Sequence, residues 1–209
     1  MKFKFFIGEK VKVVSMILAA GEAKRFGYPK QILKWKNSTI LGTVITEAVE
    51  AGFDNVFVVL GAHFELISKE LKNDLEKVAV VNNLNWSEGM FSSIKAGLTE
   101  IKKIFPDYVL VQLGDMPFIT RNILQSFIKT AEKRYDTVIA VENNRPAHPY
   151  MFAGKFINEI INADYGDGMR SFIKREFEKA YKINVNFKAA RQDIDTWDVY
   201  KKEVEESYK

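Results

Sequence analysis

Apolar stretches of strand length alternate along the chain with stretches in which apolar residues recur every three or four positions. The first kind is rich in β-branched residues, as in VKVVSMILA at residues 11–19, which is the pattern of a strand buried in a parallel sheet. The second kind predicts amphipathic helices. The expected strands occupy residues 11–19, 55–60, 77–81, 107–113 and 136–141, and the expected helices occupy residues 40–51, 64–75, 90–104 and 120–134. Such alternation predicts βαβ units, and therefore an α/β fold of three layers, Rossmann-like, with a mostly parallel sheet and helices on both faces.

The order of elements changes after Asn143. The elements expected there are an extended stretch at residues 149–153, helices at 155–163 and 169–178, a strand at 181–185 and a final helix from Thr196. The 209 residues contain no internal repeat, low-complexity segment or Pro/Ser-rich linker. A chain of this length buries roughly 70% of its unfolded surface, which is enough for one core. We therefore expect a single domain over residues 1–209.

The composition excludes several kinds of chemistry. Without cysteine the chain can form no disulfide, thiolate nucleophile or Cys-based metal site, and two histidines are too few for a multi-histidine site. The absence of cysteine fits the reducing cytoplasm, where we expect the protein to act. The longest apolar runs fall far short of the ~20 residues needed to cross a bilayer, so no membrane contact is expected. The N-terminal segment lacks a small-residue cleavage site, so it is not expected to be a signal peptide.

The net charge of +4 is unevenly distributed along the chain. Residues 1–36 contain nine Lys or Arg residues and two Glu residues, a balance of +7, so the remainder carries −3. A nucleic-acid-binding protein more often spreads basic residues over a face and interleaves aromatic residues, so no nucleic-acid partner is expected. Part of the excess surrounds one glycine-containing loop, which suits a compact polyanion such as a triphosphate. A solvated basic edge would account equally well for the four lysines nearest the N-terminus, Lys2, Lys4, Lys10 and Lys12.

The glycine-containing loop at residues 18–30 follows the first expected strand. Ligands of open α/β sheets bind beyond the carboxyl ends of the strands, so a binding loop is expected there. Gly21 and Gly27 allow main-chain N–H groups to approach phosphate oxygens. Arg25 offers a planar fork of donors and Lys30 a flexible point charge. The loop matches neither the dinucleotide fingerprint G-x-G-x-x-G nor the Walker A ending G-K-[ST], and by itself it is also compatible with a plain surface loop.

Carboxylates follow the strands at two further places. Asp115 comes directly after the buried strand at residues 107–113, where it is a natural oxygen ligand for Mg²⁺ or, alternatively, a turn residue. Asp193 and Asp195 precede the final helix, so Asp195 either caps that helix or supplies a second carboxylate to the metal. Asp167, between Gly166 and Gly168, is either another cap or a contact to the second substrate.

Six segments together resemble the MobA-like nucleotidyltransferases, and most closely their molybdenum-cofactor cytidylyltransferase branch. The segments are LAAGEAKRFGYPKQIL, NWSEGMFSSIKAGL, LGDMP, RPAHP, GDGMR and DIDT, which begin at Leu18, Asn85, Leu113, Arg145, Gly166 and Asp193. They occur in the family's order and cover about residues 14–199. The sequence departs from the family pattern at Glu22, Phe91, Ala147 and Trp197, and the last two bear on the identity of the second substrate.

The resemblance implies a role for each matching residue. Arg25, Lys30 and Asp115 are expected to act in catalysis, the first two on the triphosphate, and Asp115 and Asp195 are expected to hold Mg²⁺. The residues expected to bind the nucleotide or the acceptor are Ala19, Ala20, Gly21, Gly27, Gly61, Gly89, Ser92, Ser93, His148 and Asp167. The Leu-Ala-Ala-Gly form resembles members that use CTP rather than GTP. The implied acceptor is a molybdopterin-type phosphate, with a molybdoenzyme or its chaperone as a further partner.

Two other functions stay open. One is a sugar-phosphate nucleotidyltransferase, which shares the loop with Arg and Lys, and the other is a non-catalytic module that holds a nucleotide or cofactor for a partner enzyme. Retention of Lys30, Asp115 and Asp195 together favours an enzyme. A phosphate monoester is mostly dianionic at neutral pH, so such an acceptor needs no general base. His148 is either structural or a hydrogen-bond partner of the acceptor.

Overall fold

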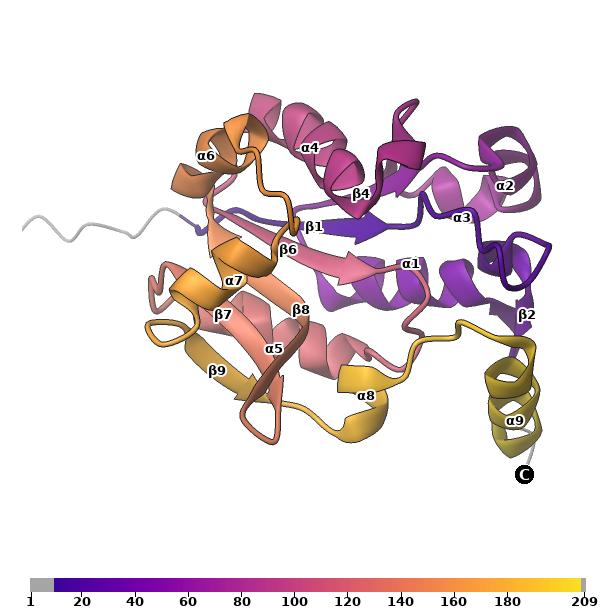
Figure 1. Ribbon diagram of the computed structural model, residues 1–209. Coiled ribbons are helices and arrows are strands. Elements are labelled where there is room, and N and C mark those ends of the chain that lie inside the picture. Colours follow the sequence, from indigo (N-terminus) through magenta and orange to yellow (C-terminus); the bar gives the residue numbers. More distant parts are fainter. Residues whose placement is uncertain (1–9, 208–209) are drawn as a thin grey trace, which may run out of the picture.

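A computed structural model describes residues 10–207. Residues 1–9 lie outside the described residues. They include Lys2 and Lys4 and the first part of the N-terminal segment that is not expected to be a signal peptide. At the centre of the fold is a seven-stranded sheet with the strand order β5-β4-β1-β6-β8-β7-β9 (Figure 1). Its strands are β1 (Val13–Leu18), β4 (Asn55–Leu60), β5 (Ala79–Asn82), β6 (Tyr108–Leu113), β7 (Thr137–Glu142), β8 (Arg145–Ala153) and β9 (Tyr181–Asn184).

The sheet is mostly parallel, as predicted. β1 pairs in parallel with β4 and β6, β4 with β5, and β7 with β9, whereas β8 runs antiparallel to both β6 and β7. Every residue of β1 is buried, because this strand lies between two others and is covered on both faces. The carboxyl ends of β1, β4 and β6 therefore open at the same edge of the sheet.

The hairpin formed by β7 and β8 differs from the expectation. β8 begins at Arg145, four residues before the expected extended stretch. Asn143 and Asn144 connect the strands with positive φ angles of 49° and 57°, which is the backbone of a two-residue hairpin turn and which asparagine tolerates. The register shifts so that Ile139 pairs with Tyr150 and the next residue of β7 pairs with Ala147. His148 and the residue after it are therefore extra residues in β8.

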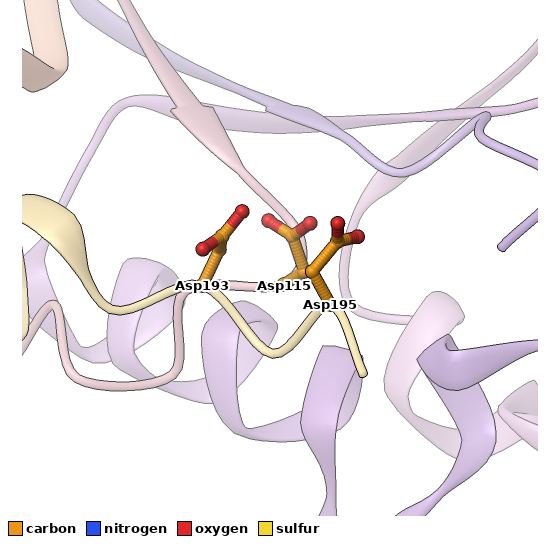
Figure 2. Close-up of side chains that lie close together, drawn as sticks. All are labelled: Asp115, Asp193 and Asp195. Atoms are coloured by element: carbon orange, nitrogen blue, oxygen red, sulfur yellow. The ribbon is translucent and has the colours of Figure 1, made fainter. Parts of the chain in front are cut away.

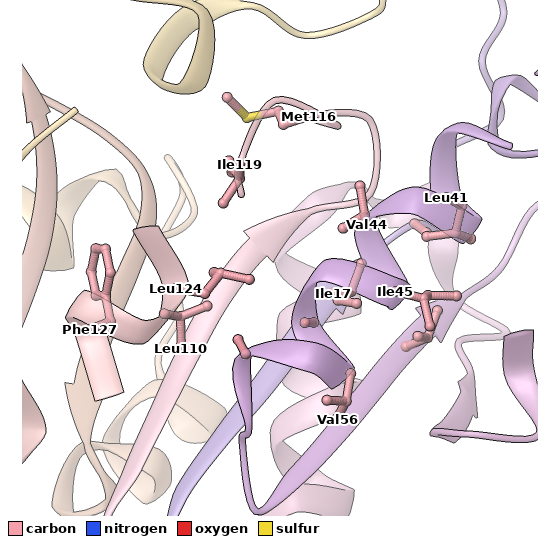
Figure 3. Close-up of a cluster of buried hydrophobic side chains, with 14 of the residues drawn as sticks. Ile17, Leu41, Val44, Ile45, Val56, Leu110, Met116, Ile119, Leu124 and Phe127 are labelled. Carbon is pink, nitrogen blue, oxygen red and sulfur yellow. The ribbon is translucent and has the colours of Figure 1, made fainter. Parts of the chain in front are cut away.

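Helices cover both faces of the sheet, which confirms the three layers. The helices are α1 (Ile40–Ala51), α2 (Phe64–Glu70), α3 (Lys72–Leu75), α4 (Met90–Ile101), α5 (Arg121–Ala131), α6 (Ile157–Asn162), α7 (Arg170–Glu176), α8 (Phe187–Arg191) and α9 (Trp197–Ser207). One core packs α1 and α5 against the sheet around Ile17, Ile45 and Phe127 (Figure 3). The other packs α4, α6 and α7 against the opposite face around Met16 and Phe172.

Some helices are shorter than expected. The helix expected at residues 64–75 is two helices, because Leu71 leaves helical geometry (φ −106°, ψ 22°) while its side chain stays in the core. The helix expected at residues 90–104 ends at Ile101 and continues as a short 3-10 turn. α1 has the expected bounds, with the Thr39 side chain capping its start and Gly52 (φ 90°) ending it. No helix within the described residues 10–207 is both long enough and apolar enough to span a bilayer.

A third, smaller core joins the loop after β1 to the C-terminal part of the chain. Its buried members are Phe26, Leu33, Trp35, Ile40 and Ile194. Trp35 lies in β2 (Lys34–Trp35), a short strand that pairs with β3 (Ser38–Thr39) and that was not expected from the sequence. Because this core lies beside the carboxyl ends of β1 and β6, it brings residues near position 30 and position 194 together there.

Candidate active site

A cleft of about 550 Å³ opens at the carboxyl ends of β1 and β6. The loop after β1 lines one side, and the segment that leads into α4 lines another. Asp115, two residues beyond β6, and Asp195 from the C-terminal segment line the cleft as well. Of the residues expected to act on the nucleotide, those that line this cleft are Ala19, Ala20, Gly21, Arg25, Lys30, Gly89, Ser93, Asp115 and Asp195.

Three carboxylates converge beside this cleft, and two of them, Asp115 and Asp195, line it (Figure 2). Oxygen atoms of Asp115, Asp193 and Asp195 lie within 4.8 Å of one another. One oxygen of Asp115, Oδ1, is buried without a hydrogen-bond partner. Burial and the neighbouring carboxylate of Asp115 raise the pKa of Asp193. Such a cluster of oxygen ligands is suited to a divalent cation, and the structure adds Asp193 to the two carboxylates expected there.

Ile194 explains why two acidic residues from the C-terminal segment reach this place. Its side chain is fully buried in the third core, and its main-chain N–H donates to the carbonyl of Asp115 at 3.0 Å. Neighbouring side chains of an extended segment point to opposite sides, so burial of Ile194 directs Asp193 and Asp195 the other way. Pairing to the main chain of Asp115 fixes their register beside that carboxylate.

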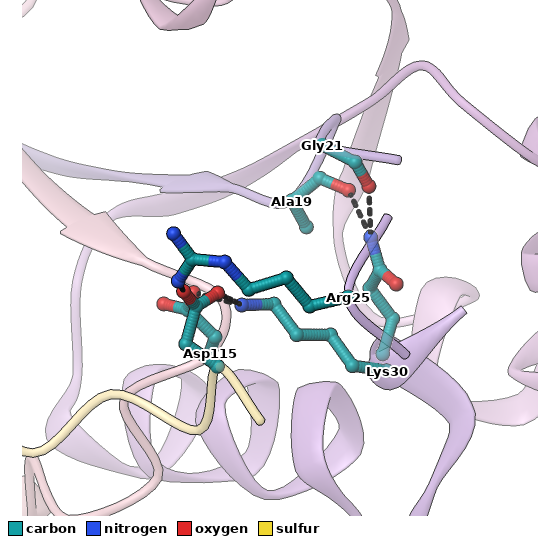
Figure 4. A network of polar contacts seen from close by, with 7 residues as sticks. Ala19, Gly21, Arg25, Lys30 and Asp115 are labelled. Atoms are coloured by element: carbon teal, nitrogen blue, oxygen red, sulfur yellow. Dashed lines mark hydrogen bonds and ion pairs between the residues drawn. The ribbon is translucent and has the colours of Figure 1, made fainter. Parts of the chain in front are cut away.

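Two basic side chains of the loop face the carboxylates (Figure 4). Lys30 Nζ donates to Asp115 Oδ2 at 2.7 Å and to Asp195 Oδ1 at 2.9 Å. The Arg25 guanidinium donates to the other oxygen of Asp195. Burial by itself lowers the pKa of Lys30, but the two carboxylates outweigh it, so the pKa of its ammonium is raised. Lys30 therefore stays charged between the carboxylates.

Gln31, next to Lys30, forms hydrogen bonds to the main chain at both ends of the segment from Ala19 to Gly21. It is only 4% exposed, and its Nε2 donates to the carbonyls of Ala19 and Gly21 at 2.9 and 3.0 Å (Figure 4). This residue could not be singled out from the sequence, because nothing in a polar side chain beside a lysine predicts its burial.

Asn83 organises the side of the cleft expected to hold the base and ribose. Its Nδ2 donates to the hydroxyls of Ser92 and Ser93 at 2.9 and 3.0 Å. Ser93 lines the first cleft, whereas Ser92 lines a neighbouring one. Gly89, with φ 102°, begins α4 in a backbone conformation that favours glycine. Asn83 lies just beyond the end of β5, and only that position could have drawn attention to it.

Two of the expected glycines lie beside the cleft rather than along it. Gly27 adopts φ 63° in the turn that carries Arg25 towards the carboxylates. Gly61 is in close contact with Trp86, since a Cβ at Gly61 would lie 2.5 Å from the Trp86 Cβ. Trp86 itself lines the cleft, so the small size of Gly61 lets that indole approach the end of β4.

A second cleft of about 1240 Å³ adjoins the first, and Met90 lines both. It lies between the start of α4, β8 and the loop before α7, and its lining includes His148, Asp167 and Ser92. Burial lowers the pKa of His148 to about 4, so its imidazole is neutral at physiological pH, and its Nδ1 has no hydrogen-bond partner. Asp167 accepts a hydrogen bond from Ser171 at 2.8 Å, so it fastens the start of α7 and lines the cleft as well.

Trp197, one of the departures from the family pattern, fastens the C-terminal helix to the loop after β1. Its Nε1 donates to the carbonyl of Phe26 at 3.1 Å, and the two rings lie 5.0 Å apart. This contact holds the turn that precedes Lys30 against the segment that carries Asp195.

The sequence matches the model of the MobA-like NTP transferase domain over residues 15–180. It is 25% identical over 184 residues to the molybdenum cofactor cytidylyltransferase of Escherichia coli (strain K12), covering 88% of this chain and 91% of that protein. It is also 25% identical over 192 residues to the nicotine blue oxidoreductase of Paenarthrobacter nicotinovorans, covering 88% and 92%. The crystal structure of Rv0371c from Mycobacterium tuberculosis H37Rv superposes with a TM-score of 0.79 at 23% identity, covering 93% of this chain and 99% of that one. This last likeness concerns the fold.

Proposed function

The chain belongs to the MobA-like NTP transferase family and is a nucleotidyltransferase, and on that premise we propose a specific reaction. In it the protein transfers CMP from CTP, with Mg²⁺, to the phosphate of a molybdopterin-type acceptor and releases pyrophosphate. The observation that carries the proposal is the convergence of three carboxylates, two of which form ion pairs with the cations of the loop beside one cleft: Asp115, Asp193 and Asp195 with Lys30 and Arg25. A site for a metal–triphosphate complex needs this combination of carboxylates and cations.

The residues present fit Mg²⁺. Mg²⁺ is bound through one or two carboxylates together with phosphate oxygens, and Asp115 has a buried oxygen without a hydrogen-bond partner. The Lys30 ammonium already lies between Asp115 and Asp195, so this position accommodates a positive charge. Asp115 and Asp195 would hold the ion, with Asp193 beside them. When bound, it would neutralise the charge on the α-phosphate and on the leaving pyrophosphate.

The chain's own side chains would orient the reactants. Lys30 and Arg25 would contact the triphosphate and stabilise the charge that gathers on the leaving pyrophosphate. An oxygen of the acceptor phosphate bonds to the α-phosphorus as the bond to the bridging oxygen of pyrophosphate breaks, so no proton has to be removed. Because no proton has to be removed and the lowered pKa of His148, about 4, makes its imidazole a weak base, His148 would act as a hydrogen-bond partner of the acceptor.

The choice of donor and acceptor rests on separate observations. The Leu18-Ala19-Ala20-Gly21 form and the cytidylyltransferase relative support CTP. The second cleft, at about 1240 Å³, exceeds the ≈ 300–1,000 Å³ of typical small-molecule sites, which favours a bulky acceptor over a simple sugar phosphate. A molybdoenzyme or its chaperone, as recipient of the product, stays a prediction.

The oxidoreductase name of one relative suggests a different chemistry. Hydride transfer would require a bound redox cofactor, and the loop after β1 lacks the dinucleotide fingerprint. Carboxylates gathered opposite two cations are instead the arrangement that binds a metal–triphosphate complex. The carboxylate cluster therefore favours nucleotidyl transfer.

Pyrophosphate release tests the proposal. We would incubate the purified protein with Mg²⁺ and each of CTP, GTP, ATP and UTP, with and without molybdopterin-type acceptor. The proposal predicts release with CTP and acceptor together. Release only with a sugar phosphate would support the sugar-phosphate alternative, and release with no pair would favour a binding module.

A further inference from the structure

One run of main-chain donors in the loop after β1, from Ala20 to Arg25, has no acceptor in the described part of the chain. Ala20 and the four residues that follow it line the first cleft, as does Arg25. Successive free N–H groups form a concave surface that binds anions, so their direction decides whether this loop can bind phosphate.

The carbonyl groups in the same peptide planes, in contrast, are held by hydrogen bonds within the protein. The carbonyls of Ala19 and Gly21 accept from Gln31 Nε2, and the carbonyl of Ala20 accepts from the N–H of Ala62 at 3.0 Å. In a trans peptide the N–H points opposite to the carbonyl of the same plane. Anchoring these carbonyls therefore turns the N–H groups of Ala20, Gly21 and Glu22 away from Gln31 and Ala62.

Packing alone does not account for an amide at position 31. Gln31 is 4% exposed, and its Oε1 is buried without a hydrogen-bond partner. An unpaired buried polar atom costs about 1–3 kcal/mol, and a methionine would fill a similar volume without that cost. The donors on Nε2 are the feature that methionine lacks. The opposite amide orientation would place Oε1 against two carbonyl oxygens, so the donor assignment follows from its surroundings.

We propose that Gln31 is a positioning residue that sets the peptide orientation of the loop after β1, so that the N–H groups of Ala20 and Glu22 bind nucleotide phosphates. The proposal rests on the proposed function, because it presupposes a triphosphate in the first cleft. Gln31 lines the first cleft but is only 4% exposed, and both hydrogen bonds of its Nε2 go to main-chain carbonyls. Its effect passes through the two carbonyls that it holds.

The test compares a triphosphate with a nucleoside. Gln31→Met removes the donors, and Gln31→Glu keeps the shape but places a carboxylate against the two carbonyls. We expect each variant to weaken CTP binding about tenfold or more, since charge-assisted hydrogen bonds are lost, and to change cytidine binding little. Both affinities would be measured by isothermal titration at one Mg²⁺ concentration.

Gln112→Met is the matched control. Gln112 is also buried with an unpaired Oε1, its Nε2 donates to Ser15 at 3.0 Å in the sheet interior, and it does not line the first cleft. This variant should lower the melting temperature while leaving the ratio of CTP to cytidine affinity unchanged. A purely structural role of Gln31 would make its variants behave like Gln112→Met.

A second measurement does not depend on variants that fold. Tripolyphosphate added to the ¹⁵N-labelled wild-type protein should shift the amide signals of Ala20 and Glu22. If wild type binds neither CTP nor tripolyphosphate, the proposed function is wrong. If wild type binds both, but these amides do not shift or Gln31→Met keeps the wild-type affinity ratio, the role of Gln31 is wrong.

Discussion

Lys30 occupies the position that the proposed metal ion needs. Its ammonium bridges Asp115 and Asp195, with Nζ–oxygen distances of 2.7 and 2.9 Å. A divalent cation can reach both carboxylates only after this ammonium has moved. Replacing Lys30 with methionine keeps most of the aliphatic volume and removes the charge. We therefore predict that Lys30→Met raises the affinity of the nucleotide-free protein for Mn²⁺, used as a spectroscopic substitute for Mg²⁺.

The size of the effect follows from the two ion pairs. Lys30 and Asp115 side chains are 11% and 21% exposed, and hydrogen bonds between charged groups in such places contribute about 1.5–3 kcal/mol. Asp195 is 40% exposed, so its pair contributes only about 0–1 kcal/mol. Moving Lys30 then costs on the order of 2 kcal/mol, which corresponds to a roughly 30-fold tighter binding of Mn²⁺ in the variant.

The assay is a titration of free Mn²⁺ by electron paramagnetic resonance, without nucleotide. Lys34→Met is the matched control, because Lys34 is an exposed lysine of β2 that does not line the cleft. Mn²⁺ should also raise the melting temperature of Lys30→Met more than that of wild type. Equal Mn²⁺ affinity in wild type and Lys30→Met, with both proteins folded, would refute the idea that Lys30 and the metal compete.

Three further predictions concern the site and the core. Asp115→Asn should abolish pyrophosphate release at any Mg²⁺ concentration with an unchanged circular dichroism spectrum, and a near wild-type rate would exclude Asp115 as a metal ligand. Burial lowers the pKa of His148 from 6.5 to about 4, so between these pH values the folded protein binds fewer protons than the unfolded chain. The unfolding free energy therefore falls as the pH drops through this range, by up to about 3 kcal/mol. Urea unfolding of His148→Gln should lack this part of the pH dependence, and an identical dependence would contradict the assignment. Gly97→Ala would place a Cβ 2.3 Å from Met16 Sδ and 2.9 Å from Val59 Cγ2, so it should lower the unfolding free energy by about 1–3 kcal/mol, whereas an unchanged urea midpoint would show that α4 has room to shift.

The layers of the fold could be predicted because a strand that is buried on both faces consists almost entirely of apolar residues. β1, β4 and β6 are near-continuous apolar runs, and each is followed by a glycine or alanine at the edge of the sheet that carries the cleft. β8 could not be predicted in full, because Arg145 to His148 shows no alternation of apolar and polar residues. The two asparagines before it, both at positive φ, were the available signal for a hairpin.

The site was predicted only in its separate parts. Asp115 could be recognised from its place after a strand, but its contact with Lys30 joins residues 85 positions apart. The pattern Asp-Ile-Asp does not say which side is buried, and that is decided by the packing of Ile194 beside Trp35. Gln31 was missed because the burial of an amide depends on tertiary neighbours. Gly61 gives Trp86 room to pack, a contact between segments that local sequence does not specify.

The fate of the α-phosphate of CTP is the most direct test of the proposed reaction. The protein would be incubated with Mg²⁺, a molybdopterin-type acceptor and CTP labelled at the α-phosphate. The products would then be separated, the label located, and their masses determined by mass spectrometry. We predict that the label joins the acceptor as a covalent CMP group, in equal amount to the pyrophosphate released. Label that stays in CTP, or that appears only as free CMP, would contradict transfer to this acceptor.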